Sequence, residues 1–187
     1  MIRRSVITAA AVTAGLAAGA ALALAAPALA GAEVSRAAGD LTRYPDQGPV
    51  ADAPEGATAR VHSVATADGK TIVTLHVSGM ESFADYGAHA HVNPCGSTGG
   101  AAGPHFQHVL DPVTPSVDPD YANPENEIWL DLSTNHAGNG RARSVVQWQF
   151  SPERRARSVV IHEKHTLTGA GQAGTAGKRI ACLTVPF

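Results

Sequence analysis

Two histidines one residue apart, His89 and His91, lie in a segment whose composition predicts a β-strand, residues 86–92. Side chains alternate between the two faces of a strand, so positions i and i+2 project to the same side. Two neutral imidazoles on one face can bind a single metal ion, and imidazole suits copper, zinc and iron. Taken alone, such a pair is more often packed or exposed than metal-binding. Its interpretation therefore depends on other ligands.

Two further histidines stand beside the two long connections between predicted strands. His105 lies inside the connection 93–126, and His162 ends the predicted strand 157–162, directly before the connection 163–177. Connections longer than about 15 residues in a compact domain are usually functional or disordered. Either histidine alone would be interpreted as structural. Together with the first pair they predict a metal site, and copper stands highest in the general affinity order of divalent ions.

Four motifs around these residues resemble those of the copper/zinc superoxide dismutase family, in the same order. They are His-Ala-His at 89–91, Gly-Pro-His-Phe at 103–106, Val-Ile-His-Glu at 160–163 and Gly-Lys-Arg-Ile-Ala-Cys at 177–182. The resemblance covers residues 71–185, and the N-terminal third of the chain shows little of it. It implies an all-β fold, an eight-stranded antiparallel Greek-key β-barrel or sandwich with two long functional loops.

The resemblance also implies roles for individual residues. Four histidines match the copper ligands of the family: His89, His91, His105 and His162. The third of these matches the imidazole that bridges copper to zinc. Arg179 matches the guanidinium that stands beside the copper and holds the anionic substrate. Asp131 resembles the zinc-binding aspartate.

The zinc half of the family pattern is incomplete. The family has two more zinc histidines, but only His108 lies between His105 and Asp131, and its spacing differs. Thr166 stands where the family has an aspartate that links the two metal sites. These departures predict a copper-only variant in which Asp131 orients the second nitrogen of His105. A re-formed zinc site of His105, His108 and Asp131 is the alternative, and zinc occupancy stays open.

The N-terminus is typical of an export signal. Arg3 and Arg4 precede an Ala-rich apolar run at 6–26, and the small residues before position 31 predict cleavage after Ala30. A membrane anchor is the alternative, but an Ala-rich run inserts weakly. We therefore expect a signal peptide at 1–30, no membrane span after its cleavage, and a secreted, periplasmic or cell-surface location.

The chain contains two cysteines, Cys95 and Cys182. An exported chain meets an oxidising compartment, where an even pair usually forms a disulfide. These positions also match the disulfide cysteines of the resembled family. We therefore predict a disulfide that closes a long loop.

The remaining sequence predicts one domain rich in strands. A Pro- and Gly-rich stretch at 31–57 is interpreted as a polar leader with at most one short strand, and 58–187 as the copper-binding domain. No segment after the signal shows a helical apolar repeat. The predicted strands are 60–65, 71–77, 86–92, 127–131, 144–150, 157–162 and 178–183. A net charge of -2 argues against nucleic-acid binding, and the oligomeric state stays open.

We therefore predict an exported superoxide dismutase that converts superoxide to oxygen and hydrogen peroxide at a histidine-ligated copper centre. Superoxide is the expected small-molecule substrate, and the fixed charge of Arg179 would raise its rate of encounter. The alternative is an exported copper-binding module of the same fold without dismutase activity. A structural sandwich that has lost its metal is a third interpretation, which the complete set of copper-matching histidines disfavours.

Overall fold

The computed structural model describes residues 32–44 and 53–187, and these are almost entirely β-structure and connecting loops. The predicted signal peptide lies outside the described residues. Within them, no helix is long and apolar enough to cross a membrane. The elements are β1 (Glu33–Asp40), β2 (Thr42–Arg43), β3 (Thr58–Ala65), β4 (Thr71–Ser78), β5 (Asp85–His91), the 3-10 helix η2 (Gly99–Ala102), β6 (Leu132–Ser133), β7 (Gly140–Val146), β8 (Ser158–His162) and β9 (Arg179–Thr184).

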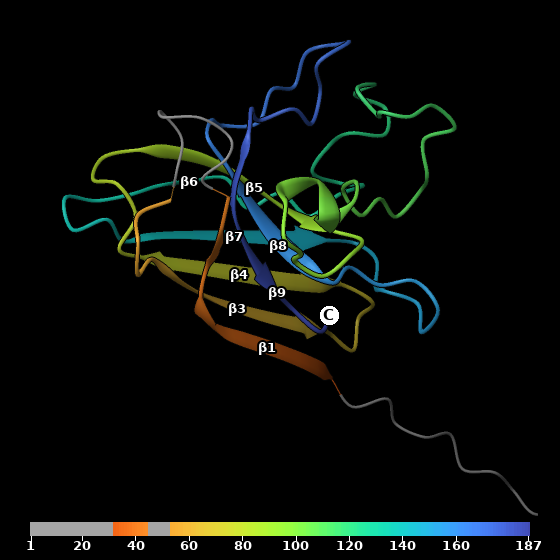
Figure 1. The fold of residues 1–187 in the computed structure, drawn as a ribbon. Helices are drawn as coiled ribbons and strands as arrows, with labels where there is room; N and C mark the ends of the chain where they lie inside the picture. Colours follow the sequence, from red (N-terminus) through yellow and green to blue (C-terminus); the bar gives the residue numbers. More distant parts are fainter. Residues whose placement is uncertain (1–31, 45–52) are drawn as a thin grey trace, which may run out of the picture.

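The strands form two antiparallel sheets that face one another (Figure 1). One sheet has the order β1-β3-β4-β7 and the other the order β2-β9-β8-β5-β6. Neighbours such as β4 and β7, or β5 and β8, are distant in sequence, so the chain crosses between the sheets. The predicted all-β sandwich is confirmed. The sheets do not close into a barrel, and the two-residue strands β2 and β6 extend the edges of the second sheet.

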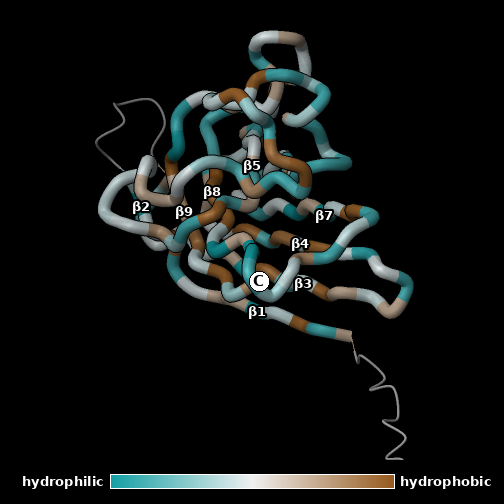
Figure 2. The backbone as a smooth tube through the Cα atoms, turned by 90° about the vertical axis from the view of Figure 1, so that its right-hand side faces the viewer, coloured by the Kyte–Doolittle hydropathy of each residue, from teal (hydrophilic) through white to brown (hydrophobic). Residues whose placement is uncertain are grey.

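Alternation along the strands places the hydrophobic core between the two sheets. In β4, Val73, Leu75 and Val77 are buried and alternate with more exposed residues. Brown, hydrophobic segments recur along β3, β4, β8 and β9 in Figure 2. In β5 the small residues Ala88 and Ala90 pack into this core. The residues between and after them must therefore project away from it, on the other face of the strand.

Strands β5 and β8 are buried on both faces, although each uses only one face for the core. The reason is that two long loops cover the outer face, residues 92–131 and residues 163–178. Figure 1 shows both loops on the same side of the molecule. They contact each other directly, since Gly171 N–H donates to the Val117 carbonyl at 3.1 Å. The enclosed space between β5, β8 and these loops holds the histidines.

Three sequence predictions of secondary structure differ from the structure. The stretch predicted as a leader with at most one short strand contains β1, which pairs with β3 over eight residues, and β2. An edge strand with one exposed face needs few apolar side chains, so its polar composition resembled a leader. Residues 127–131 make only isolated bridges. The strand predicted at 144–150 begins earlier and ends at Val146, before the chain turns over the core.

The predicted disulfide is confirmed. Cys95 and Cys182 are bonded, with their Cα atoms 5.8 Å apart and a sequence separation of 87. The bond ties the start of the first loop to β9. It therefore joins the loop that carries His105 to the strand that begins with Arg179.

Candidate metal centre

Four histidines meet between the second sheet and its covering loops. His89 and His91 come from β5, His162 comes from the end of β8, and His105 is held beside His91 by an isolated bridge between the loop and the strand. One ring nitrogen of each lies within 4.8 Å of the corresponding nitrogen of every other. The sequence predicted these four residues as a set, and the structure brings them together.

Three of these imidazoles have a buried nitrogen without a hydrogen-bond partner: Nδ1 of His89, Nε2 of His91 and Nε2 of His162. Leaving a buried polar atom unpaired costs free energy, about 1–3 kcal/mol for each group. Three such atoms pointing into one space would be unfavourable unless a ligand completes them. A metal ion bound by neutral imidazoles does so, and the donor set fits copper, zinc or iron.

The opposite nitrogens of the buried rings are held by the protein. His91 Nδ1 lies 2.9 Å from the Gly103 carbonyl, and His162 Nδ1 lies 3.4 Å from the Gly177 carbonyl. A carbonyl can only accept, so each Nδ1 carries the proton and each Nε2 presents a lone pair. These contacts fix the tautomer that a metal ligand requires.

His89 is held by a threonine that is itself held by Asp131. Its Nε2 lies 2.7 Å from Thr166 Oγ1, and this hydroxyl donates to Asp131 Oδ1 at 2.6 Å. The Thr166 amide also donates to Asp131 Oδ2 at 2.8 Å. Because the threonine proton goes to the carboxylate, the hydroxyl oxygen accepts from His89 Nε2. That arrangement leaves Nδ1 free to bind a metal.

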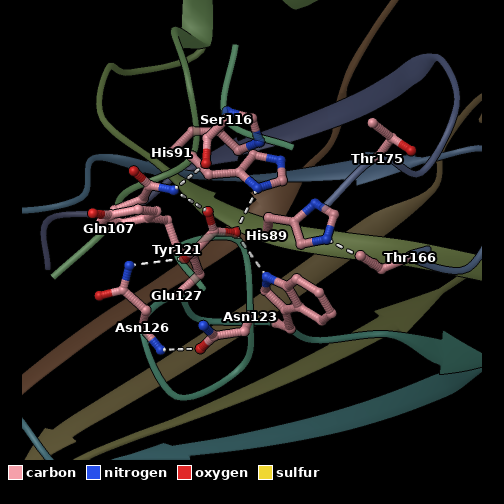
Figure 3. Close-up of polar contacts among 12 residues, drawn as sticks. His89, His91, Gln107, Ser116, Tyr121, Asn123, Asn126, Glu127, Thr166 and Thr175 are labelled. Atoms are coloured by element: carbon pink, nitrogen blue, oxygen red, sulfur yellow. Dashed lines mark hydrogen bonds and ion pairs between the residues drawn. The ribbon is translucent and has the colours of Figure 1, made fainter. Parts of the chain in front are cut away.

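Glu127 holds His105, a contact that the sequence patterns did not predict. The buried carboxylate accepts hydrogen bonds from His105 Nδ1 at 2.7 Å, Trp129 Nε1 at 2.7 Å and Gln107 Nε2 at 2.9 Å. Figure 3 shows the contact between Glu127 and Gln107, and that between His89 and Thr166. The prediction that Asp131 orients His105 is therefore wrong, because Glu127 occupies that position and Asp131 acts on His89 instead. The available signal was a carboxylate at the start of the predicted strand 127–131, two residues before Trp129.

His108 lies away from the four histidines. Its ring stacks on Trp148, with the ring centres 4.9 Å apart and the planes at 5°. Among the residues that the structure describes, the four histidines are the only group of three or more His, Cys, Asp or Glu placed to hold a metal. His108 and Asp131, the alternative zinc ligands predicted from the sequence, do not join such a group.

Burial keeps the clustered imidazoles neutral. It lowers the pKa of His89 and of His91 well below the usual histidine value, and lowers the pKa of His162 to about 3. Electrostatic repulsion between each of these rings and the neighbouring His105 ring lowers the pKa of all three further. Metals bind the unprotonated ring, so these side chains are ready to bind a metal at neutral pH.

The metal-free protein is expected to lose stability as pH falls below about 6. The three buried histidines stay neutral when folded, whereas unfolded histidines protonate near pH 6.5. The unfolded state therefore binds more protons between about pH 6.5 and the lowered folded pKa, about 3 for His162. Each histidine contributes a slope of about 1.4 kcal/mol per pH unit in this window, with stability rising as pH rises.

Denaturant unfolding of the metal-free protein between about pH 7 and pH 4.5 measures this slope. His162→Gln is expected to reduce it by about 1.4 kcal/mol per pH unit. His76→Gln, which changes an exposed histidine of β4, is expected to leave it unchanged. Equal slopes in the two variants would contradict the assignment.

Arg179 stands at the start of β9, beside the histidines. Its Nη1 donates to the Gly99 carbonyl of η2 at 2.9 Å, and a Cβ on Gly99 would lie only 2.8 Å from the Arg179 Cβ. Only glycine therefore allows η2 to approach this closely. Burial lowers the pKa of Arg179, although the guanidinium remains charged because arginine titrates so high.

A pocket of about 400 Å³ lies between the two loops and gives access to this region. Arg179, His105 and His162 all line it. The exposed side chains of Leu110 and Val113 also line it. The pocket therefore combines apolar side chains with the polar side chains of the metal centre. A small molecule in this pocket could therefore lie close to both the Arg179 guanidinium and the imidazoles of His105 and His162.

No family model matches the sequence, and no curated protein matches it. Solved structures do resemble the fold. The Cu/Zn superoxide dismutase from Brucella abortus is 18% identical with a TM-score of 0.54, and the match covers 83% of this chain and 99% of that chain. The clock protein EA4 is 19% identical with a TM-score of 0.52, covering 82% and 92%. The chain has a fold similar to that of Cu/Zn superoxide dismutase. At this identity the likeness concerns the fold alone.

Proposed function

We propose that this chain is an exported, copper-dependent superoxide dismutase that converts superoxide to oxygen and hydrogen peroxide. One observation carries the proposal: four imidazoles place one ring nitrogen each within 4.8 Å of one another, and two of them, His105 and His162, line a pocket together with Arg179. The fold likeness to a Cu/Zn superoxide dismutase is consistent with it. Superoxide is a small anion, and the pocket contains a fixed positive charge where such an anion would enter.

Copper, held by His89, His91, His105 and His162, would supply the one-electron redox chemistry that dismutation requires. The protein's part is to hold and steer the reactants. Arg179 attracts the anion and orients it beside the histidines, since a positive charge in a low-dielectric cleft raises the rate of encounter. The hydrogen bonds of Thr166, Gly103 and Gly177 keep the ligand rings in place.

We infer that the centre works without zinc. In the resembled family His105 would bridge two metals, one through each ring nitrogen. Here its Nδ1 is bonded to the Glu127 carboxylate at 2.7 Å. A carboxylate in this position can orient the ring and raise its basicity, as carboxylates do for ligating imidazoles elsewhere. Glu127 therefore occupies the position from which a second metal would bind His105.

An exported location agrees with the disulfide, because such bonds persist in oxidising compartments. The predicted signal peptide belongs to the same proposal. Its test is the N-terminal residue of the protein recovered from outside the cytoplasm, which is expected to be Gly31. Recovery of the protein only from the cytoplasm, with its N-terminus uncleaved, would contradict the proposed location.

Superoxide consumption by the copper-loaded, zinc-free protein tests the proposed activity. Fast consumption is expected, together with a fall of about tenfold in Arg179→Ala at unchanged copper content. Lys164→Ala is the matched control, because it removes an exposed cation of the neighbouring loop. Consumption that needs added zinc would contradict the copper-only centre. Bound copper without consumption would favour the alternative, a copper-binding module of this fold.

A further inference from the structure

The outer face of the sheet β1-β3-β4-β7 is strongly basic. Side chains alternate along each strand, and the positions that point away from the core are partly or fully exposed. Six of them carry nitrogen cations or imidazoles: Arg36, Arg60, His62, His76, Arg141 and Arg143. Four of the chain's 14 lysines and arginines therefore lie on one sheet face. We name this surface the basic face.

Strand register arranges the basic face in two rows. Across the sheet, Arg36 pairs with His62, His62 with Thr74, and Thr74 with Arg143. In the next row, Arg60 pairs with His76, and His76 with Arg141. Neighbouring strands lie about 4.8 Å apart, so each row is roughly 10–15 Å long, and the rows lie about 7 Å apart. These residues are far apart in the sequence and become neighbours only through strand pairing.

Little negative charge compensates the basic face. Among the described residues, none of the four arginines has a carboxylate within ion-pair distance. The carboxylate at an outward position of these strands is Asp40, at the end of β1. Two nearby acidic side chains are already paired elsewhere, Glu33 with Arg155 and Asp68 with Lys70. The charge is therefore available to an external anion.

The face is hollowed over β1, β3 and β4. A depression of about 660 Å³ is lined by the basic side chains Arg36, Arg60, His62 and His76, with Ala38 and Ser78 between them. Ala38 takes the position in its row where a longer side chain would fill this space, since it pairs with Arg60. A concave, basic surface fits an extended chain better than it fits a flat bilayer.

We propose that the basic face binds a linear phosphate polymer. The guanidinium group of arginine binds phosphate through two parallel hydrogen bonds. Two rows of cations match a polymer that carries a negative charge on each repeating unit. The four strands contain no Phe, Trp or Tyr, so bases could not stack on this surface as they do in single-stranded nucleic-acid sites. A second copy of the chain would bring like charges together if it used the same face.

The basic face is independent of the metal centre. The histidines lie on the other sheet, beneath the two long loops, and no residue of the face belongs to that group. Figure 1 shows β1, β3 and β4 away from those loops. Polymer binding would hold the protein at a phosphate-rich surface while its metal pocket stays open. The inference stands or fails separately from the proposed activity.

Binding of inorganic polyphosphate to the purified protein tests the proposal. About three phosphate contacts predict that log K falls with log salt concentration with a slope near -2. The charge reversal Arg60→Glu with Arg141→Glu is expected to weaken binding at least about tenfold and to flatten this slope. The control Arg157→Glu with Lys164→Glu makes the same change in net charge at exposed residues outside the face, and should change binding less than about threefold.

A second variant, Arg36→Ala with Arg143→Ala, removes charge from the other row and should weaken binding about tenfold. Its unfolding midpoint, compared with that of the unmodified protein, distinguishes lost binding from lost folding. Equal weakening by the control pair would overturn the proposal, because net charge alone would then explain binding. So would binding to vesicles containing phosphatidylglycerol, or to single-stranded DNA, without binding to polyphosphate.

Discussion

Glu127→Ala is expected to lower copper affinity about 100-fold and to destabilise the metal-free protein by roughly 3 kcal/mol or more. The carboxylate accepts hydrogen bonds from His105, Trp129 and Gln107. Its removal takes the acceptor from three N–H groups, and each lost hydrogen bond costs about 1 kcal/mol or more. Gln107 Nε2 keeps its other hydrogen bond, to Ser116 Oγ at 2.9 Å. His105 also loses the group that keeps the proton on Nδ1. Copper competition with a chelator and denaturant unfolding of the metal-free protein measure the two effects.

Glu127→Gln separates the charge of this side chain from its shape. An amide oxygen can still accept a hydrogen bond, but the amide nitrogen brings a donor to a site where all three partners are donors. We expect a smaller loss of stability than in Glu127→Ala, with copper affinity still about tenfold lower. Glu153→Ala, at an exposed turn, is the matched control and should change neither quantity. Copper affinity in Glu127→Gln equal to that of the unmodified protein would show that the negative charge is not required.

Cys95→Ser with Cys182→Ser is expected to lower the free energy of unfolding by about 4–5 kcal/mol. The bond closes a loop with a sequence separation of 87, and cross-linking a long loop removes much of the entropy of the unfolded chain. Denaturant unfolding of the double variant, beside the unmodified protein in its oxidised and reduced states, measures this contribution. The reduced protein and the double variant should have the same stability. A loss below about 1 kcal/mol would contradict the expectation.

The same variant is expected to lose activity before it loses copper. Cys95 lies just before η2, whose Gly99 carbonyl accepts the hydrogen bond of Arg179. Without the disulfide this loop is less constrained, and Arg179 loses a fixed partner. The histidine ligands of β5 and β8 are held by sheet pairing, so they should retain copper. Copper content measured together with superoxide consumption distinguishes the two effects.

The ligand set was predictable from local patterns. The spacing of His89 and His91 places both on one face of any strand, and His162 ends a run of β-branched residues. Motif order then connected them to His105 and Arg179. The disulfide was predictable because the chain contains only two cysteines. Each of these features depends on a short stretch of sequence or on the number of cysteines, and none depends on which strands are neighbours in the sheets.

The groups that support the ligands were not predictable in the same way. Glu127 and His105 are 22 residues apart, and Thr166 and His89 are 77 residues apart. The sequence pattern predicts that Asp131 supports His105, whereas in the fold it supports His89 through Thr166. A carboxylate at the end of an apolar segment looks the same in sequence whether it faces solvent or a metal ligand. The path of the two loops over β5 decides which one it contacts.

The edge strand β1 and the basic face also depend on strand pairing and not on local sequence alone. The sequence by itself determined the all-β class, the four clustered imidazoles, the disulfide and the position of Arg179 within a matching motif. Only the tertiary structure decided that β1 belongs to the first sheet, that Glu127 holds His105, and that four arginines share one surface. Local spacing sets which face a side chain takes on its strand. Pairing between strands far apart in sequence sets which side chains become neighbours.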